Sequence, residues 1–233
     1  MVDQAALIRS FADYARTLSS PYDIGDVLYR LTDQVTEILA VDGAGVSLGD
    51  SGGGLRFVTA TDERIAKVEE RQVDVGQGPC QDAFTSGDQV TSADLAREER
   101  WPAYTPVAAR QGCAAVAGIP MLAGDQRIGA LNLYSRTPRE WPADAMEIAQ
   151  VVADMASGYV LNARTLTEAQ RLNSQLQHAL DSRVIIEQAK GALAERHQIS
   201  ASAAFDRLRQ HARERNRKIH EVAQAVVDGD LKF

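Results

Sequence analysis

The longest proline-free stretch of the sequence, from residue 143 onward, constrains the fold most. In its first half, positions suited to a buried stripe recur at alternating steps of four and three residues: Ile148, Val152, Met155, Tyr159, Asn162, Leu166, Ala169, Asn173, Leu176 and Leu180. This heptad spacing is typical of a coiled coil, and the two asparagines are polar seam residues of the kind that fixes register and strand number. We therefore predict a parallel dimeric stalk over residues 142–180. A long helix packed on its own domain is the alternative.

The residues before this stretch alternate between helical and strand patterns. Apolar side chains have helical spacing over Val2–Leu18 and Ile24–Leu39. The segments "GAGVSLG" and "LRFVTATD" flank a glycine turn, and "CAAVAGIPML" and "RIGALNLYS" form a second, longer hairpin. Segments with helical character, such as "DERIAKVEERQ" and "RWPAYTPVAARQG", lie between the strands. Residues 1–141 are therefore expected to form an α+β domain, an antiparallel sheet with flanking helices.

Residues 181–233 have the pattern of a three-helix bundle. The first helix continues to about His197, and the second begins at a cap on Ser200 or Ser202. The second helix is expected to bury Ala204, Phe205, Leu208 and Ala212, and the third to bury Ile219, Val222, Ala223, Val226 and Val227. A bundle of about 50 residues is marginally stable alone, so fusion to a dimeric stalk would help it.

Charge is distributed unevenly along the chain, whose formal net charge is −7. Residues 1–180 carry 15 Lys and Arg against 24 Asp and Glu, whereas residues 181–233 carry 10 against 8. Within Phe205–His220, six basic side chains accompany two acidic ones. The field that matters to a nucleic acid is local to the docking face, so the acidic whole-chain balance does not exclude such a partner. A solvated helix face with i,i+4 charge pairs is the alternative.

Lys190 and Gly191 stand in the middle of the first bundle helix. A glycine there costs roughly 0.5–1 kcal/mol relative to alanine, so we expect a neighbouring helix or a ligand to approach closely. Arg209, Arg213 and Arg217 are spaced four apart on the second helix and form a basic ridge that ends in "NRK". A lysine beside a missing side chain, facing this ridge, would admit a phosphate backbone or a splayed base.

The segment from Ala179 to Val227 closely resembles the ANTAR domain, a bacterial RNA-binding three-helix module of transcription antitermination regulators. The match runs through Ser182-Arg183, Ile186 to Gly191, Ala204-Phe205, Leu208-Arg209, Ala212-Arg213, Asn216 and Val222-Ala223. The resemblance implies that a dimer binds nascent mRNA carrying two small hairpins with hexanucleotide loops and prevents a terminator from forming. The predicted RNA contacts are Ser182, Arg183, Lys190, Gly191, Arg209, Arg213, Asn216, Arg217 and Lys218.

Residues 1–141 resemble a GAF domain of the type joined to ANTAR modules, through "GQGPCQDAF", "RWPAY" and "GALNLYS". This resemblance implies a sensor for a small molecule that the sequence does not name. Cys80 follows Gly-Pro at a predicted helix start, where the pKa of a thiol can be lowered, and Cys113 opens a central strand. Trp101 and Tyr104 are candidates for lining a ligand pocket. The alternative for all four is ordinary core packing.

The sequence contains no recognisable binding motif for a cofactor or a metal. The two cysteines are far apart and form no C-x-x-C, which argues against a zinc site or a disulfide framework. All four histidines fall in the last quarter, so the larger part of the chain lacks histidine for acid-base chemistry. There is no basic leader before an apolar run, and no stretch approaches the roughly 18–20 apolar residues of a membrane span. We expect a cytoplasmic protein that is not an enzyme and has no membrane partner.

Two other functions compete with RNA binding. The bundle could serve a DNA-binding regulator as a helix-turn-helix, but "SASAAFDRL" presents alanines where a recognition helix presents short polar side chains. Some GAF-fold proteins resemble free methionine sulfoxide reductases, which work through cysteines. That chemistry needs a nucleophilic thiol and a resolving partner, so it requires the fold to bring Cys80 and Cys113 together. It leaves the stalk and the basic bundle unexplained.

Overall fold

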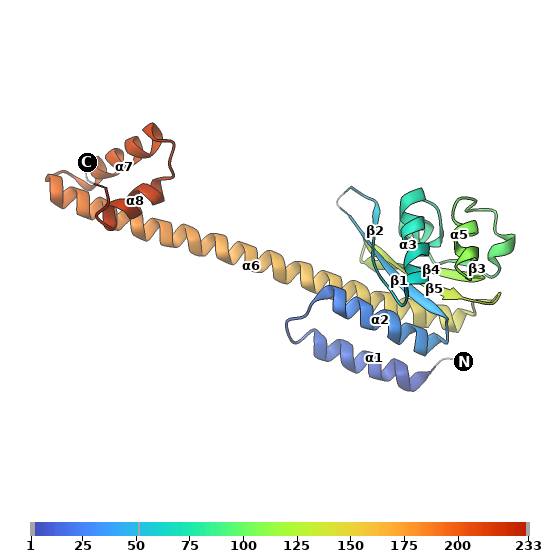
Figure 1. The fold of residues 1–233 in the computed structure, drawn as a ribbon. Coiled ribbons are helices and arrows are strands. Elements are labelled where there is room, and N and C mark those ends of the chain that lie inside the picture. The colour runs from blue at the N-terminus through green and yellow to red at the C-terminus, as the bar shows by residue number, and fades with distance from the viewer. Residues whose placement is uncertain (1–2, 51, 232–233) are drawn as a thin grey trace. The chain divides into compact units, whose positions relative to one another are not determined.

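The structure is a computed structural model that describes residues 3–50 and 52–231, with the backbone alone at 178 and 179. The elements are α1 (Gln4–Thr17), α2 (Ile24–Leu39), β1 (Gly43–Gly49), β2 (Leu55–Ala60), α3 (Glu63–Val75), α4 (Pro79–Ser86), β3 (Val90–Ser92), η1 (Leu95–Arg97), α5 (Thr105–Arg110), β4 (Ala115–Ala123), β5 (Gln126–Ser135), α6 (Ala143–His197), α7 (Ala201–Glu214) and α8 (Ile219–Val227) (Figure 1). The chain divides into two compact units, Met1–Thr165 and Leu166–Phe233. The predicted α+β class is confirmed, with helices on both faces of a sheet in the first unit.

The five strands form one antiparallel sheet in the order β2-β1-β5-β4-β3. Side chains alternate between its faces along each strand, as strand geometry requires. In β5, Leu131 and Leu133 belong to the core on one face, whereas Tyr134 belongs to the core on the other. The two faces therefore have separate cores.

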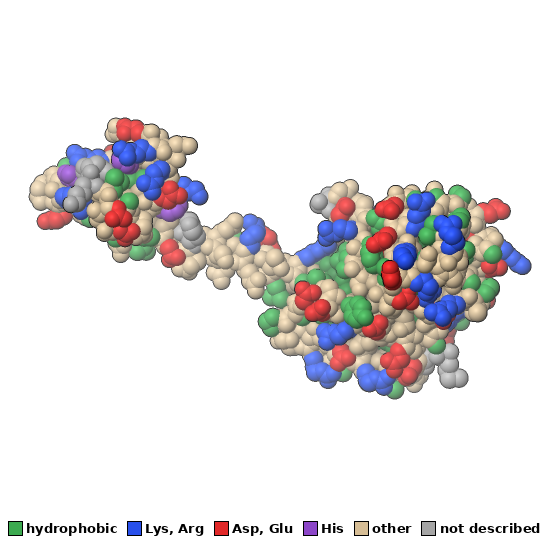
Figure 2. Space-filling view, in the orientation of Figure 1, with side chains coloured by type: hydrophobic (Ala, Val, Ile, Leu, Met, Phe, Trp, Pro, Cys, Tyr) green, Lys and Arg blue, Asp and Glu red, His purple; other side chains and the backbone are tan. Residues whose placement is uncertain are grey.

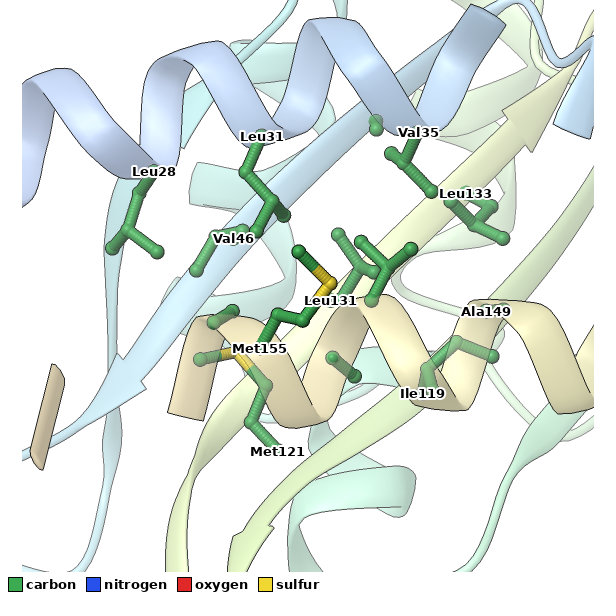
Figure 3. Close-up of a cluster of buried hydrophobic side chains, with 14 of the residues drawn as sticks. Leu28, Leu31, Val35, Val46, Ile119, Met121, Leu131, Leu133, Ala149 and Met155 are labelled. Carbon is green, nitrogen blue, oxygen red and sulfur yellow. The ribbon is translucent and has the colours of Figure 1, made fainter. Parts of the chain in front are cut away.

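Helix α2 and the first turns of α6 cover one face of the sheet. Val35 of α2 points toward Leu133 of β5 and Leu31 points toward Val46 of β1, and Ala149 and Met155 of α6 belong to the same cluster (Figure 3). Asp23 caps the start of α2, because its carboxylate accepts a hydrogen bond from the backbone N–H of Asp26 at 3.1 Å. Burial of this apolar stripe, rather than helix propensity, is the main stabilisation of such a helix.

The first part of α6 belongs to this domain core and is not available to a partner chain. Val152, Met155 and Tyr159 are 0%, 5% and 4% exposed within their own unit. The amide of Asn162 donates a hydrogen bond to the Tyr22 hydroxyl at 3.2 Å. The prediction of an interchain seam is therefore wrong for Val152, Met155 and Tyr159, because the core of their own domain takes their side chains, with the Tyr159 ring against Tyr14 and Tyr22.

Helices α3 and α4 lie directly on the other face of the sheet, over glycines. A Cβ on Gly45 of β1 would meet the carboxylate of Glu69, and one on Gly118 of β4 would lie 2.7 Å from the carbonyl carbon of Pro79. Because these glycines have no side chain, the Glu69 side chain of α3 and the backbone at the start of α4 can lie directly against the sheet. Trp101 and Tyr104, from the segment before α5, are buried in the same layer.

In the second unit, the end of α6 packs with α7 and α8 around a small apolar core. The buried members are Ala189, Leu193, Ala204, Leu208, Ala212, Val222, Ala223 and Val226. Ser200 caps α7 by accepting a hydrogen bond from the N–H of Ala203 at 3.2 Å, which confirms one of the two predicted caps. Two expected core residues differ: Val227 is 40% exposed, and Phe205 is half-buried and lies outside this cluster. Within the part of the chain that the structure describes, no helix is long and apolar enough to cross a membrane.

Candidate functional site

A groove of about 690 Å³ lies along the end of α7 and the start of α8. Its apolar lining comes from Phe205, Ala212 and Ile219, and its polar lining from Arg209, Arg213, Asn216 and Arg217. Figure 2 shows Lys and Arg side chains beside hydrophobic ones on this unit. The groove, which we call the basic groove, thus gathers four of the nine predicted RNA contacts in one place.

The polar side of the basic groove follows from helix spacing and from a turn. Arg209 and Arg213 are one helical turn apart on α7, and both are exposed. Asn216, two residues beyond the end of α7, has the left-handed conformation, at φ 48°, which asparagine adopts more readily than most residues. Arg217 therefore lies past the helix and not on it as expected. The N–H of Arg217 then donates to the carbonyl of Ala212 at 2.8 Å, which holds Arg217 beside the groove. Asn216 therefore has a backbone role in shaping the groove.

Lys190 adjoins the groove through Phe205 and has partners within the chain. Its Nζ lies 2.8 Å from each carboxylate oxygen of Glu187 and 5.7 Å from the centroid of the Phe205 ring. The side chain is only 20% exposed. The structure thus supplies the intrachain role that the sequence left open, because Lys190 bridges the first bundle helix and α7.

Gly191 is exposed, and a Cβ built on it would meet no atom within 4 Å. The packing of the described residues therefore gives no reason for a glycine here, and the space beside it is open to a ligand. Of the other predicted contacts, Arg183 and Lys218 are exposed and Ser182 is half-buried. None of these four residues lines the basic groove.

The part of α6 in the second unit presents apolar side chains to solvent. Leu166 is 45% exposed and Leu176 is 57% exposed, and Asn173 between them is also exposed. Leu180 continues the same heptad spacing and is 60% exposed. Leu172, the residue before Asn173, does not belong to the heptad spacing and is 51% exposed. These residues, unlike Val152, Met155 and Tyr159, are free for an interface.

A buried carboxylate cluster, which sequence reasoning missed, fills the layer between the sheet and α3. The fully buried Glu69 accepts hydrogen bonds from Tyr134 Oη at 2.9 Å, Asn132 Nδ2 at 3.0 Å and Ser47 Oγ at 3.4 Å. Burial raises the pKa of Glu69 to about 7, against the opposing effect of these three donors. The signal that could have revealed this cluster is the glycine at position 45 in a strand, opposite an asparagine that interrupts the apolar run of β5.

Gln72 extends this cluster to the start of α4. Its Nε2 donates to the Tyr134 hydroxyl at 3.0 Å, and its Oε1 accepts from the N–H of Cys80 at 2.9 Å. One amide side chain therefore links the carboxylate cluster to the first turn of the helix that carries Cys80.

The two cysteines are buried and free. Burial is the main cause that raises the pKa of Cys80, with the charge of Glu69 second, and burial raises the pKa of Cys113 to about 11. The expectation of a lowered Cys80 pKa at the helix start is therefore wrong, because the cost of burying a thiolate outweighs the position. The two thiols also lie in different clusters, Cys80 with Phe84 and Cys113 with Trp101.

The remaining sensor candidates, Trp101 and Tyr104, are core residues. They are 2% and 0% exposed, and their rings meet edge to face at a centroid distance of 6.0 Å. The indole Nε1 donates to Asp82 Oδ2 at 2.8 Å, which ties this segment to α4. Both rings are packed in the core, so a ligand could reach them only by displacing the side chains around them.

Comparison with known proteins agrees with both halves of this description. The GAF domain family matches residues 23–160, and the ANTAR domain family matches residues 174–227. The comparison with curated proteins found no match.

Solved structures of single domains resemble about two thirds of the chain or slightly more. The GAF domain from a phosphoenolpyruvate-protein phosphotransferase of Coxiella burnetii has a TM-score of 0.57 at 12% identity, covering 70% of this chain and 98% of that one. The corresponding Acinetobacter domain has a TM-score of 0.53 at 15% identity, covering 68% and 94%. A free methionine-R-sulfoxide reductase from Neisseria meningitidis has a TM-score of 0.54 at 13% identity, covering 71% and 96%. At such identities the likeness shows the fold alone.

The chain belongs to the GAF domain family, whose match spans more than half of its length. Its carboxyl-terminal module is an ANTAR domain, so the chain is a regulatory protein that joins a sensory domain to an output domain.

Proposed function

We propose that this protein is a transcription antitermination regulator that binds RNA at the basic groove. The observation that carries the proposal is the gathering of Arg209, Arg213 and Arg217 around one groove in the ANTAR domain. Guanidinium groups bind phosphate oxygens through charge-assisted, bidentate hydrogen bonds, and phosphate contacts supply most of the affinity for nucleic acids. The three arginines are the phosphate-binding groups.

The RNA target is a pair of small hairpins with hexanucleotide loops in nascent mRNA, and the protein acts on it as a homodimer. Each ANTAR domain takes one hairpin. Binding stabilises the paired hairpins against the competing terminator only to the extent that the protein prefers the paired fold. The mechanism is therefore binding energy, without bond chemistry.

The dimer forms through the exposed stripe of α6 at Leu166, Asn173 and Leu176. Each leucine is about half-exposed, and burying a leucine fully stabilises an interface by roughly 1.5–3 kcal/mol. This shortened seam replaces the longer one, because the earlier heptad positions are already in the domain core. The GAF domain supplies the control, through a small molecule whose chemistry the sequence does not name.

The test is retention of hairpin RNAs with randomised six-nucleotide loops on the purified full-length protein. The retained hairpins are then measured against Arg209→Ala and Arg213→Ala. Each variant should weaken binding and reduce the slope of log affinity against log salt by about one. Arg207→Ala is the matched control, since Arg207 is exposed on the same helix but does not line the groove. Retention of no hairpin, or equal losses at all three positions, would contradict the proposal.

Competition with duplex DNA separates the RNA regulator from a DNA regulator using the same bundle. An RNA regulator keeps its hairpin in excess duplex DNA of random and genomic sequence, whereas a DNA regulator loses it. The cysteine-dependent redox enzyme is disfavoured by the raised pKa of both buried thiols and by their separate clusters.

A further inference from the structure

Phe205 occupies a position that the fold of its own domain does not require. The apolar stripe of α7 is complete without it, since Ala204, Leu208 and Ala212 are the α7 members of the buried cluster. Phe205 follows Ala204 by one residue, which turns its side chain by about 100° from that stripe. The ring is left half-buried in the wall of the basic groove.

The surroundings of this ring are cationic. Arg209 and Arg213 follow it at one and two helical turns on the same wall of the groove. The Nζ of Lys190 lies over the ring, 5.7 Å from its centroid. The ring is only partly exposed, and these cations surround it in the wall of the groove. It is a good site for a base with its phosphates, which need a π-face and positive charge together.

We propose that Phe205 is the stacking platform for one unpaired nucleobase of the RNA, with Arg209 and Arg213 holding the phosphates on either side of it. The proposal rests on the proposed function and adds the residue that recognises single-stranded RNA. Because Lys190 covers one face of the ring, the base takes the other. Duplex RNA keeps its bases stacked on one another, so this contact selects a loop nucleotide and not a stem.

The site also explains why Lys190 is tied to Glu187. The double contact at 2.8 Å holds the ammonium over the ring and compensates its charge in the free protein. The lysine thereby orients the ring and leaves phosphate binding to the arginines, whose guanidinium groups line the groove.

The experiment uses the full-length protein and hairpins that the wild-type protein retains, with 2-aminopurine placed singly at each loop position. Stacking on Phe205 should quench the fluorescence at one position and leave the stem unaffected. Phe205→Leu keeps apolar bulk and removes the π-face, so it should abolish that quench and weaken binding about 5- to 100-fold. Phe205→Tyr keeps an aromatic ring, so it should retain both the quench and the wild-type affinity.

Val227→Ala is the control, since Val227 is 40% exposed on α8 and does not line the groove. It should bind as the wild type does. Wild-type binding with no quenched loop position, or binding by Phe205→Leu within twofold of wild type, would overturn the stacking proposal while leaving RNA binding at the groove intact. Failure of the wild type to retain any hairpin would overturn both. If the full-length protein bound a protein segment in preference to hairpin RNA, Phe205 would belong to a binding site for a protein partner instead.

Discussion

The hydroxyl of Tyr134 donates a hydrogen bond to Oε1 of Glu69 across 2.9 Å in the layer between the sheet and α3. The other two donors to this carboxylate, from Ser47 and Asn132, are neutral as well. A buried carboxylate held only by neutral donors loses more from burial than it gains from them, and its pKa rises to about 7.

Stability of the GAF domain should therefore fall as pH rises from about 5 to 8. The folded state holds the Glu69 proton up to about pH 7, whereas the unfolded chain releases it near pH 4.5. Between these values the folded state binds more protons, so the free energy of unfolding decreases with pH, by on the order of 2–3 kcal/mol. Glu69→Gln should lack this decrease. Urea unfolding followed by tryptophan fluorescence reports on this unit, which holds both tryptophans.

Glu70→Gln is the matched control for that measurement, because Glu70 is the next residue of α3 and is exposed. It should keep the decrease between pH 5 and 8. A flat profile in the wild-type protein would show that Glu69 is ionised at neutral pH in spite of its burial.

Gly118→Ala should destabilise the GAF domain by about 1–3 kcal/mol, the usual range for an overpacked site. The new Cβ would lie 2.7 Å from the carbonyl carbon of Pro79, a backbone atom that can move only if α4 moves. Gly49→Ala should cost less, since it meets the Phe84 ring at 3.0 Å and a ring can turn. Equal melting temperatures of the two variants would contradict this account of how α4 sits on the sheet.

Gly191→Ala should stabilise the ANTAR domain and weaken RNA binding. Alanine favours the helix by about 0.5–1 kcal/mol over glycine, and nothing within 4 Å obstructs its Cβ. Thermal unfolding by circular dichroism measures the first effect, and hairpin binding measures the second. The gain in stability serves as the folding control. Unchanged affinity would remove Gly191 from the RNA face.

Leu176→Asp should convert a dimer to a monomer at micromolar concentration, as light scattering would show. The substitution places charge in the proposed seam at a residue that is 57% exposed in the single chain. Leu172→Asp is the matched control, with the same residue type at 51% exposure but off the heptad spacing. Dissociation of both variants alike, or a monomeric wild type, would contradict the seam.

Neither cysteine should react with a maleimide at pH 7 in the folded protein, whereas both should react in urea. Burial raises the pKa of Cys113 to about 11 and that of Cys80 further, so little thiolate forms. Mass spectrometry counts the labelled thiols. Rapid labelling of Cys80 without unfolding would restore the redox alternative. Cys80→Ser should leave hairpin binding unchanged.

The elements could be predicted from the sequence wherever the determinant is local. The helix over Ile24–Leu39 has the predicted bounds, because its apolar spacing lies within the segment and its cap, Asp23, is the residue directly before it. The strand pairs and the Ser200 cap of α7 follow in the same way. The ANTAR and GAF resemblances rested on such local runs, and the family matches confirm them.

Periodicity alone could not identify the surface that covers an apolar stripe. The heptad spacing over Val152, Met155 and Tyr159 fits a partner helix as well as the core of its own domain, and the domain core buries these residues here. Phe205 is likewise apolar, and the sequence predicts it in the core. Ala204, Leu208 and Ala212 fill the α7 side of that core, and the Phe205 ring lines the groove instead.

Most of the elements in their order, the two domain families and the arginine ridge could be predicted from the sequence, because these depend on spacing along one chain. The folded arrangement was needed to show that Glu69 is buried against Gly45, that both thiols are buried and that Phe205 lines one groove with Arg209 and Arg213. Burial and electrostatic environment depend on atoms brought together from distant segments, and no local pattern specifies those neighbours.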